Sequence, residues 1–170
     1  MRHLIDAARA RCATQNWYSA LYLCLTLPDI CVKMETPGSS GPGEKYRAWF
    51  DTYAKPKYQN EFFGPDFAFI TGADCWGLRC SILHEGRDVV AKKLTTDALS
   101  RFSFTSRNTH LIKIGDVLVV NVSKFVDEMT SAVEAWLVVV QDNAEVQARI
   151  SEMAIVRSEP FNPIPGVRVG

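Results

Sequence analysis

The stretch from Ala73 to Arg87 places two costly polar side chains, Arg79 and His84, in an otherwise apolar helical segment. Burying a guanidinium or an imidazole without a partner costs several kcal/mol. The fold must therefore either provide partners for both groups or present them at a cleft or an interface. This requirement constrains the architecture of the chain as well as its candidate chemistry.

The same segment is bounded by clear helix signals. Thr71 followed three residues later by Asp74 has the form of a capping box, and Gly86 fits a C-terminal cap, so the sequence predicts a helix from Thr71 to Glu85. Its apolar residues surround nearly the whole circumference: Cys75, Trp76, Leu78, Cys80, Ile82 and Leu83. That distribution is typical of an inner helix of a bundle.

Helical spacing recurs on both sides of this segment. Apolar residues from Asp6 to Leu27 predict a long first helix that ends at Pro28, and Tyr46 to Tyr53 predicts a short helix. From Ser123 to Met153 the pattern predicts a closing helix of about 30 residues, roughly 45 Å long.

Two segments between these helices lack helical spacing. Met34 to Lys45 is rich in glycine, proline and serine, which predicts an exposed loop. Tyr58 to Phe69 is aromatic and irregular, and we expect Phe62, Phe63 and Phe67 to pin it to the core.

A change from helical to alternating spacing after Lys92-Lys93 predicts a small β insertion at about 101–122. Phe102 and Phe104 alternate with serines, and Gly115-Asp116 has the form of a two-residue hairpin turn. We therefore expect a three-stranded antiparallel meander before the long last helix.

The composition fits one ordinary domain. With 170 residues, of which 47% are hydrophobic, we expect residues 1–158 to form a single mainly α-helical domain, followed by an extended tail at 159–170. Nineteen basic and nineteen acidic side chains cancel, so RNA could be bound only by a local basic patch. Five cysteines without framework spacing predict reduced thiols, and the absence of apolar leader or spanning segments predicts a cytoplasmic protein without membrane contact.

The sequence LRCSILHEG, from Leu78 to Gly86, resembles the Rx4-6H motif of HEPN domains, a helical nuclease and nucleotide-binding fold of prokaryotic defence and toxin systems. The predicted order of elements is similar to that fold as well. The resemblance implies a HEPN-like helical bundle with the β meander inserted before its last helix. The segment from Asn16 to Cys31 also resembles one that accompanies this motif in uncharacterised bacterial proteins, which implies no activity.

In HEPN ribonucleases the histidine and the arginine of the motif cleave RNA without a metal, usually at a cleft between two protomers. The resemblance therefore implies a homodimer without a cofactor, in which His84 is the general acid or base for attack by the 2′-hydroxyl and Arg79 stabilises the phosphorane-like transition state. An imidazole exchanges a proton near neutral pH, and a guanidinium presents a planar fork to phosphate oxygens. Asp74, Cys80 and Glu85 are the expected supporting residues.

Two features depart from the family pattern. The residue after the arginine is commonly polar, often asparagine, whereas Cys80 here removes a contact to phosphate or backbone. A separation of five residues also rotates His84 by about 140° from Arg79 on an ideal helix. We therefore expect the two groups to converge only if the helix unwinds near Gly86 or if a second protomer supplies one of them.

The same residues also have a structural interpretation. Arg79 can form a buried ion pair with a nearby acidic residue, and the candidates are Asp74, Glu85 and Asp88. His84 can stabilise the C-terminal end of its helix. The chain would then be a non-catalytic interaction or structural domain with an unidentified protein partner, and nucleotide binding without cleavage is a third interpretation.

Other candidate sites are weaker. Cys80 and His84 share one helix face, but a zinc ion would need further ligands, such as His110 or Cys31, brought there by the fold, so we predict no metal. We expect His3 and His110 to be surface groups. The four tryptophans have the spacing of core residues: Trp17, Trp49, Trp76 and Trp136.

Overall fold

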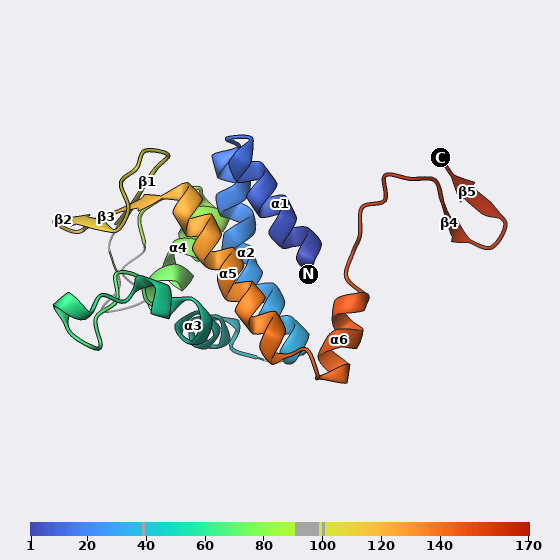
Figure 1. Cartoon of the computed structure of the whole chain (residues 1–170), viewed down its shortest axis with the longest axis horizontal. Coiled ribbons are helices and arrows are strands. Elements are labelled where there is room, and N and C mark those ends of the chain that lie inside the picture. Colours follow the sequence, from blue (N-terminus) through green and yellow to red (C-terminus); the bar gives the residue numbers. More distant parts are fainter. Residues whose placement is uncertain (39, 91–98, 100) are drawn as a thin grey trace.

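The computed structural model describes residues 1–38, 40–90, 99 and 101–170, and this part of the chain is mainly α-helical, as predicted. The helices are α1 (Arg2–Ala13), α2 (Trp17–Glu35), α3 (Pro42–Tyr53), α4 (Gly72–Glu85), α5 (Val122–Val139) and α6 (Ala144–Ser151), with short 3₁₀ helices η1 (Lys55–Tyr58) and η2 (Glu61–Phe63). Helix α2 packs against α1, α3, α4 and α5 and so lies at the centre of the bundle (Figure 1). No helix of the described residues is long and apolar enough to cross a membrane.

The prediction of one long first helix is wrong, because two helices occupy that region. Gln15 adopts a φ of 59° between them, and the Asn16 side chain caps α2 by accepting a hydrogen bond from the Ser19 amide. Helix α2 then continues through Pro28 to Glu35. A proline inside a helix costs one backbone hydrogen bond, and the burial of the apolar residues around Pro28 offsets this cost.

The closing helix is also divided. Helix α5 ends at Val139, and the Asn143 side chain caps α6 by accepting a hydrogen bond from the Val146 amide at 3.1 Å. The polar turn before α6 therefore provides a new helix start inside a region whose apolar spacing predicted one continuous helix.

The motif helix α4 has the predicted caps. The Thr71 hydroxyl accepts from the Asp74 amide, and the Asp74 carboxylate accepts from the Thr71 amide, which completes the capping box. Gly86 ends the helix with a φ of 66°, a left-handed conformation that glycine adopts without strain. The helix is therefore held at both ends by local sequence.

The small sheet has the strand order β1-β3-β2, from β1 (Arg101–Thr105), β2 (Ile112–Ile114) and β3 (Val117–Asn121). Strands β2 and β3 form the predicted antiparallel hairpin, but β1 is parallel to β3, so the prediction of an antiparallel meander is wrong. The connection between β1 and β2 crosses the end of the sheet, where the Asn121 amide group donates to the Arg107 carbonyl at 2.6 Å. Lys92-Lys93, where the spacing changes, lies outside the described residues.

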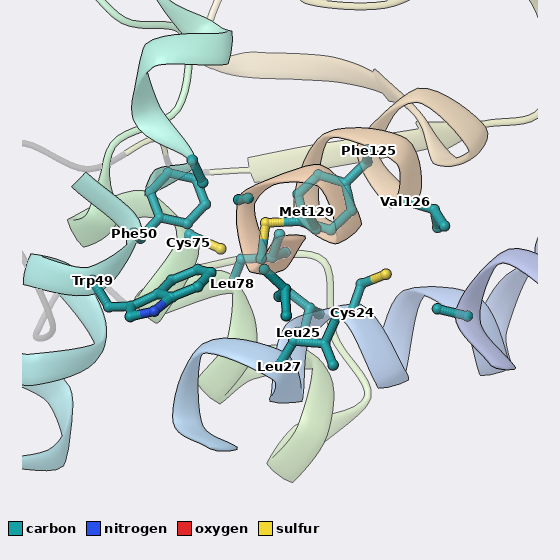
Figure 2. Packing of buried hydrophobic residues seen from close by; sticks show 14 of the residues in the cluster. Cys24, Leu25, Leu27, Trp49, Phe50, Cys75, Leu78, Phe125, Val126 and Met129 are labelled. Atoms are coloured by element: carbon teal, nitrogen blue, oxygen red, sulfur yellow. The ribbon is translucent and has the colours of Figure 1, made fainter. Parts of the chain in front are cut away.

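The core lies between α2, α3, α4 and α5. Figure 2 shows Phe125 and Met129 of α5 beside Leu25 of α2, with Phe50 of α3 and Leu78 of α4 around them, and all five are completely buried. Two of the four tryptophans, Trp49 and Trp136, are buried as predicted, whereas Trp17 and Trp76 are only half-buried. All five cysteines are free thiols.

The aromatic segment is anchored by different residues from those expected. Phe62 and Phe63 are 89% and 57% exposed, so the prediction that they pin the segment to the core is wrong. Tyr58 and Ile70 are buried at its two ends instead, and Tyr58 stacks on Phe50.

The ends of the other irregular segments also differ from expectation. The predicted loop at 34–45 is shorter, because α3 begins at Pro42. The tail forms an antiparallel hairpin, β4 (Phe161–Ile164) and β5 (Val167–Val169), where an extended segment was predicted. This hairpin projects away from the helices (Figure 1).

Candidate functional site

Arg79 is held between the motif helix and α2. Its Nε donates to the Asp29 carboxylate at 2.9 Å, and the exposed fractions of the two side chains are 19% and 25%. Its guanidinium also lies over the Trp76 ring, 5.2 Å from the centroid, in a cation–π arrangement. The acidic partner is therefore Asp29, a residue 50 positions away, and none of the three partners predicted from the sequence.

His84 lies exposed near the end of α4 and meets the same guanidinium. The Nη1 of Arg79 is 2.8 Å from the Nε2 of His84. A guanidinium can only donate, so Nε2 accepts this hydrogen bond and carries no proton, and the neutral ring holds its proton at Nδ1. The three side chains form a continuous series in the order Asp29, Arg79 and His84.

The expectation that the helix must unwind, or that a second protomer must supply one group, is wrong. Helix α4 is continuous through Glu85, and both groups belong to one chain. The long arginine side chain spans the angular offset that separates positions 79 and 84 on the helix. An arginine and a histidine five residues apart can therefore meet on the surface of a regular helix.

The electrostatics of the site keep Arg79 charged. Burial alone would lower the pKa of Arg79, but the charge and the hydrogen bond of Asp29 raise it by more, so the pKa lies above its ordinary value. Burial has the opposite effect on the neighbouring Cys80 thiol, whose pKa it raises. This effect outweighs the lowering by Arg79, so Cys80 is a neutral thiol at neutral pH. The site thus presents a fixed cation beside a neutral imidazole nitrogen.

Of the expected supporting residues, only Cys80 lies beside Arg79. The Asp74 carboxylate is buried in the capping box at the other end of α4, where it also accepts from the Leu99 amide at 2.5 Å. Glu85 is half-exposed and makes a loose ion pair with Arg87 at 3.8 Å. Asp74 therefore orders the start of the helix and does not contact the arginine or the histidine.

Sequence reasoning missed Asp29 as a site residue. Because Pro28 was expected to end the first helix, Asp29 was placed outside it, whereas α2 continues and directs this side chain toward α4. The available signal was a single carboxylate between the apolar pairs Leu27-Pro28 and Ile30-Cys31. A lone charge in an apolar helix needs a partner, and Arg79 is the matching charge.

The prediction of a surface position for His110 is wrong. Its side chain is 8% exposed, its Nε2 lies 3.0 Å from the Glu128 carboxylate, and its Nδ1 accepts from the Asn121 amide at 3.2 Å. Since Nδ1 accepts, Nε2 carries the proton and donates to Glu128. His110 therefore fixes the end of the small sheet to α5. It is not available as a further ligand of a metal ion held by Cys80 and His84.

Within the described ranges, no group of three or more histidine, cysteine, aspartate or glutamate side chains could hold a metal ion. The Cys80 and His84 pair thus gains no third ligand there.

The fold and the site define a mainly α-helical protein in which an arginine contacts an exposed histidine and forms an ion pair with a carboxylate. No family model matches the chain, and no curated protein or solved structure matches it. The function is therefore argued from the chemistry of Asp29, Arg79 and His84.

Proposed function

We propose that the chain is a metal-independent endoribonuclease of HEPN type that cleaves RNA phosphodiesters at Arg79 and His84. The observation that carries this proposal is the 2.8 Å contact between Arg79 Nη1 and His84 Nε2 at an exposed position. It joins a phosphate-binding cation to a group that can exchange a proton near neutral pH, within one hydrogen bond.

The hydrogen bond from Arg79 to Asp29 favours phosphate binding in one orientation. Because Nε is occupied by the carboxylate, the outer edge formed by Nη1 and Nη2 faces the ligand. A phosphate oxygen that accepts from Nη1 takes the place of His84 Nε2 and frees that nitrogen. Binding of the substrate thus prepares the base that the reaction needs.

The reaction follows from this arrangement. His84 Nε2 accepts the proton of the 2′-hydroxyl, the 2′-oxygen forms a bond to phosphorus, and the bond from phosphorus to the 5′-oxygen breaks. The His84 of a second copy, in its protonated imidazolium form, gives a proton to the leaving 5′-oxygen, so the first His84 ends the step protonated and the second ends it neutral. The products are a 2′,3′-cyclic phosphate and a 5′-hydroxyl, and Arg79 stabilises the charge on the equatorial oxygens of the transition state.

The second proton donor requires a homodimer, because His110 is engaged with Glu128 and His3 lies on α1. We expect the purified protein to have a mass near 38 kDa in light scattering, twice the 19.0 kDa of one chain. A mass of one chain at micromolar concentration would contradict the site built from two copies.

Arg79→Lys is expected to lower the rate of RNA cleavage by at least about tenfold, because lysine keeps the charge but loses the planar fork that contacts Asp29 and phosphate together. The assay follows single-stranded RNA in EDTA and identifies the ends of the products. Arg11→Lys, at an exposed position of α1, is the matched control and should leave the rate unchanged. An Arg79→Lys protein as active as the wild type would refute the role of the fork.

A second candidate function is a non-catalytic helical interaction domain, with a protein partner that the sequence does not identify. It is favoured by the position of the Asp29–Arg79 ion pair, which is largely buried where α2 meets α4. The ion pair therefore stabilises the packing of these two helices. Under this alternative the wild type leaves RNA intact, while Arg79→Lys and Asp29→Asn each lower the melting temperature. The cleavage assay and a melting curve on the same variants therefore separate the two functions.

A further inference from the structure

A cavity of about 300 Å³ lies where the start of α2, the end of α4 and the end of β1 meet. Four aromatic side chains line it: Trp17, Tyr18, Tyr22 and Phe104. Its volume is at the lower end for ligand sites, which suits one ring system with its substituents and is too small for a folded peptide. The cavity therefore favours a small planar ligand.

The tyrosines show why the ligand should be flat. Tyr18 and Tyr22 are four residues apart, so they share one face of α2, yet Tyr18 is 75% exposed and Tyr22 is 40% exposed. Both side chains thus line the cavity and keep surface open to solvent. Free aromatic faces along a groove are the means by which proteins stack unpaired bases.

Charged groups stand at one side of the same cavity. Asp88 and Arg87 line it directly after the helix cap Gly86. The Asp88 carboxylate forms an ion pair with Arg101, whose Nε donates to it at a long 3.3 Å, and a carboxylate has capacity for further donors. Since a carboxylate only accepts, it selects a ring whose edge carries N–H donors.

We propose that this cavity binds a guanine base of single-stranded RNA. Guanine offers two adjacent donors, N1–H and the 2-amino group, to the two oxygens of Asp88, whereas adenine, cytosine and uracil offer fewer or differently spaced donors. Arg87, which also lines the cavity, is exposed and makes only a loose ion pair with Glu85 at 3.8 Å, so its guanidinium can contact the phosphate of the same nucleotide.

The cavity and the arginine–histidine pair lie along the same two helices. Asp29 follows Tyr22 by seven residues, which is two turns along one face of α2 and roughly 10 Å. On α4, Ile82 lines the cavity one turn after Arg79. A base in the cavity therefore belongs to a nucleotide close to the phosphate that Arg79 binds. The guanine site would then make cleavage specific for positions beside guanosine. In this respect the inference rests on the proposed ribonuclease function.

The test is a titration of the whole chain with guanosine 5′-monophosphate, followed by tryptophan fluorescence, because Trp17 lies in the cavity. We expect saturable quenching that is lost in Trp17→Phe, and weaker binding of the adenosine, cytidine and uridine monophosphates. Tyr18→Ala should weaken binding by at least about fivefold. Phe62→Ala, which removes an even more exposed aromatic ring elsewhere, is the matched control and should change nothing.

Asp88→Asn tests the choice of base. It keeps the size of the side chain but replaces one acceptor oxygen with a donor, so we expect guanosine monophosphate to bind about tenfold more weakly, with its preference over the adenosine nucleotide lost. Tighter binding of another nucleotide, binding indifferent to Tyr18→Ala, or binding of N-acetyltyrosinamide in place of every nucleotide would each overturn the proposal.

The two proposals can fail separately. If guanosine monophosphate binds in the cavity and the protein leaves RNA intact, the guanine site stands and the ribonuclease proposal falls. If RNA is cleaved in EDTA but no nucleotide quenches Trp17, the ribonuclease stands and the guanine site falls.

Discussion

His84→Ala is expected to lower the rate of RNA cleavage by about 100-fold or more, the usual scale for the loss of a general acid or base. His84 is exposed, and its one hydrogen bond to Arg79 is at the surface, so the variant should fold as the wild type does. The circular dichroism spectrum checks the fold, and the cleavage rate in EDTA checks the chemistry. The products of the residual reaction should still end in 2′,3′-cyclic phosphates.

His3→Ala is the matched control for this experiment. His3 is also exposed and also lies on a helix, but it belongs to α1 and does not contact Arg79. We expect it to cleave RNA at the wild-type rate. If both histidine variants retain full activity, the cleaving group is not His84, and if EDTA stops the wild type, the reaction depends on a metal ion.

Gly72→Ala is expected to lower the melting temperature by roughly 2–12 °C. A Cβ at this position would lie 2.8 Å from the Arg47 Cα and 2.9 Å from its carbonyl carbon, and both belong to backbone that cannot rotate away. Helix α4 would have to move from α3, which also strains the hydrogen bond from the Gly72 amide to Asp51 at 2.8 Å. Overpacking of this kind costs about 1–3 kcal/mol, and each kcal/mol lowers the melting temperature of a chain of this size by about 2–4 °C.

Ala73→Gly is the reverse exchange at the neighbouring position and provides the control. It adds no atom and costs at most about 1 kcal/mol of helix propensity, so its melting temperature should fall less than that of Gly72→Ala. Thermal unfolding followed at 222 nm measures both. An unchanged or raised melting temperature for Gly72→Ala would show that the two helices do not approach each other so closely.

The sequence predicts helix α4 well because its signals are local. Thr71, Asp74 and Gly86 form the caps through contacts within a few residues, and the structure has all of them. The helix breaks before α2 and α6 were missed although their signals were local too. Asn16 and Asn143 each cap the next helix, and the apolar spacing around them hides the interruption.

The rest of the fold and of the site depends on contacts between distant segments. The parallel pairing of β1 with β3 depends on how the chain returns through residues 106–111, which alternation of apolar residues does not encode. Asp29 and Arg79 are 50 positions apart, and nothing local joins them. The contact of Arg79 with His84 depends on the conformation of one long side chain, so helix geometry alone predicted that the two groups would diverge.

The central position of α2 has a consequence for how the chain is made. Helix α2 is complete at Glu35, but α5, which covers much of its apolar surface, begins only at Val122, about 90 residues later. At a translation rate of about 5–20 residues per second, the ribosome needs roughly 5–18 s to supply that partner. During this interval the nascent chain carries an apolar helix that only α1, α3 and α4 can cover, which makes it a candidate client for chaperones that bind at the ribosomal exit.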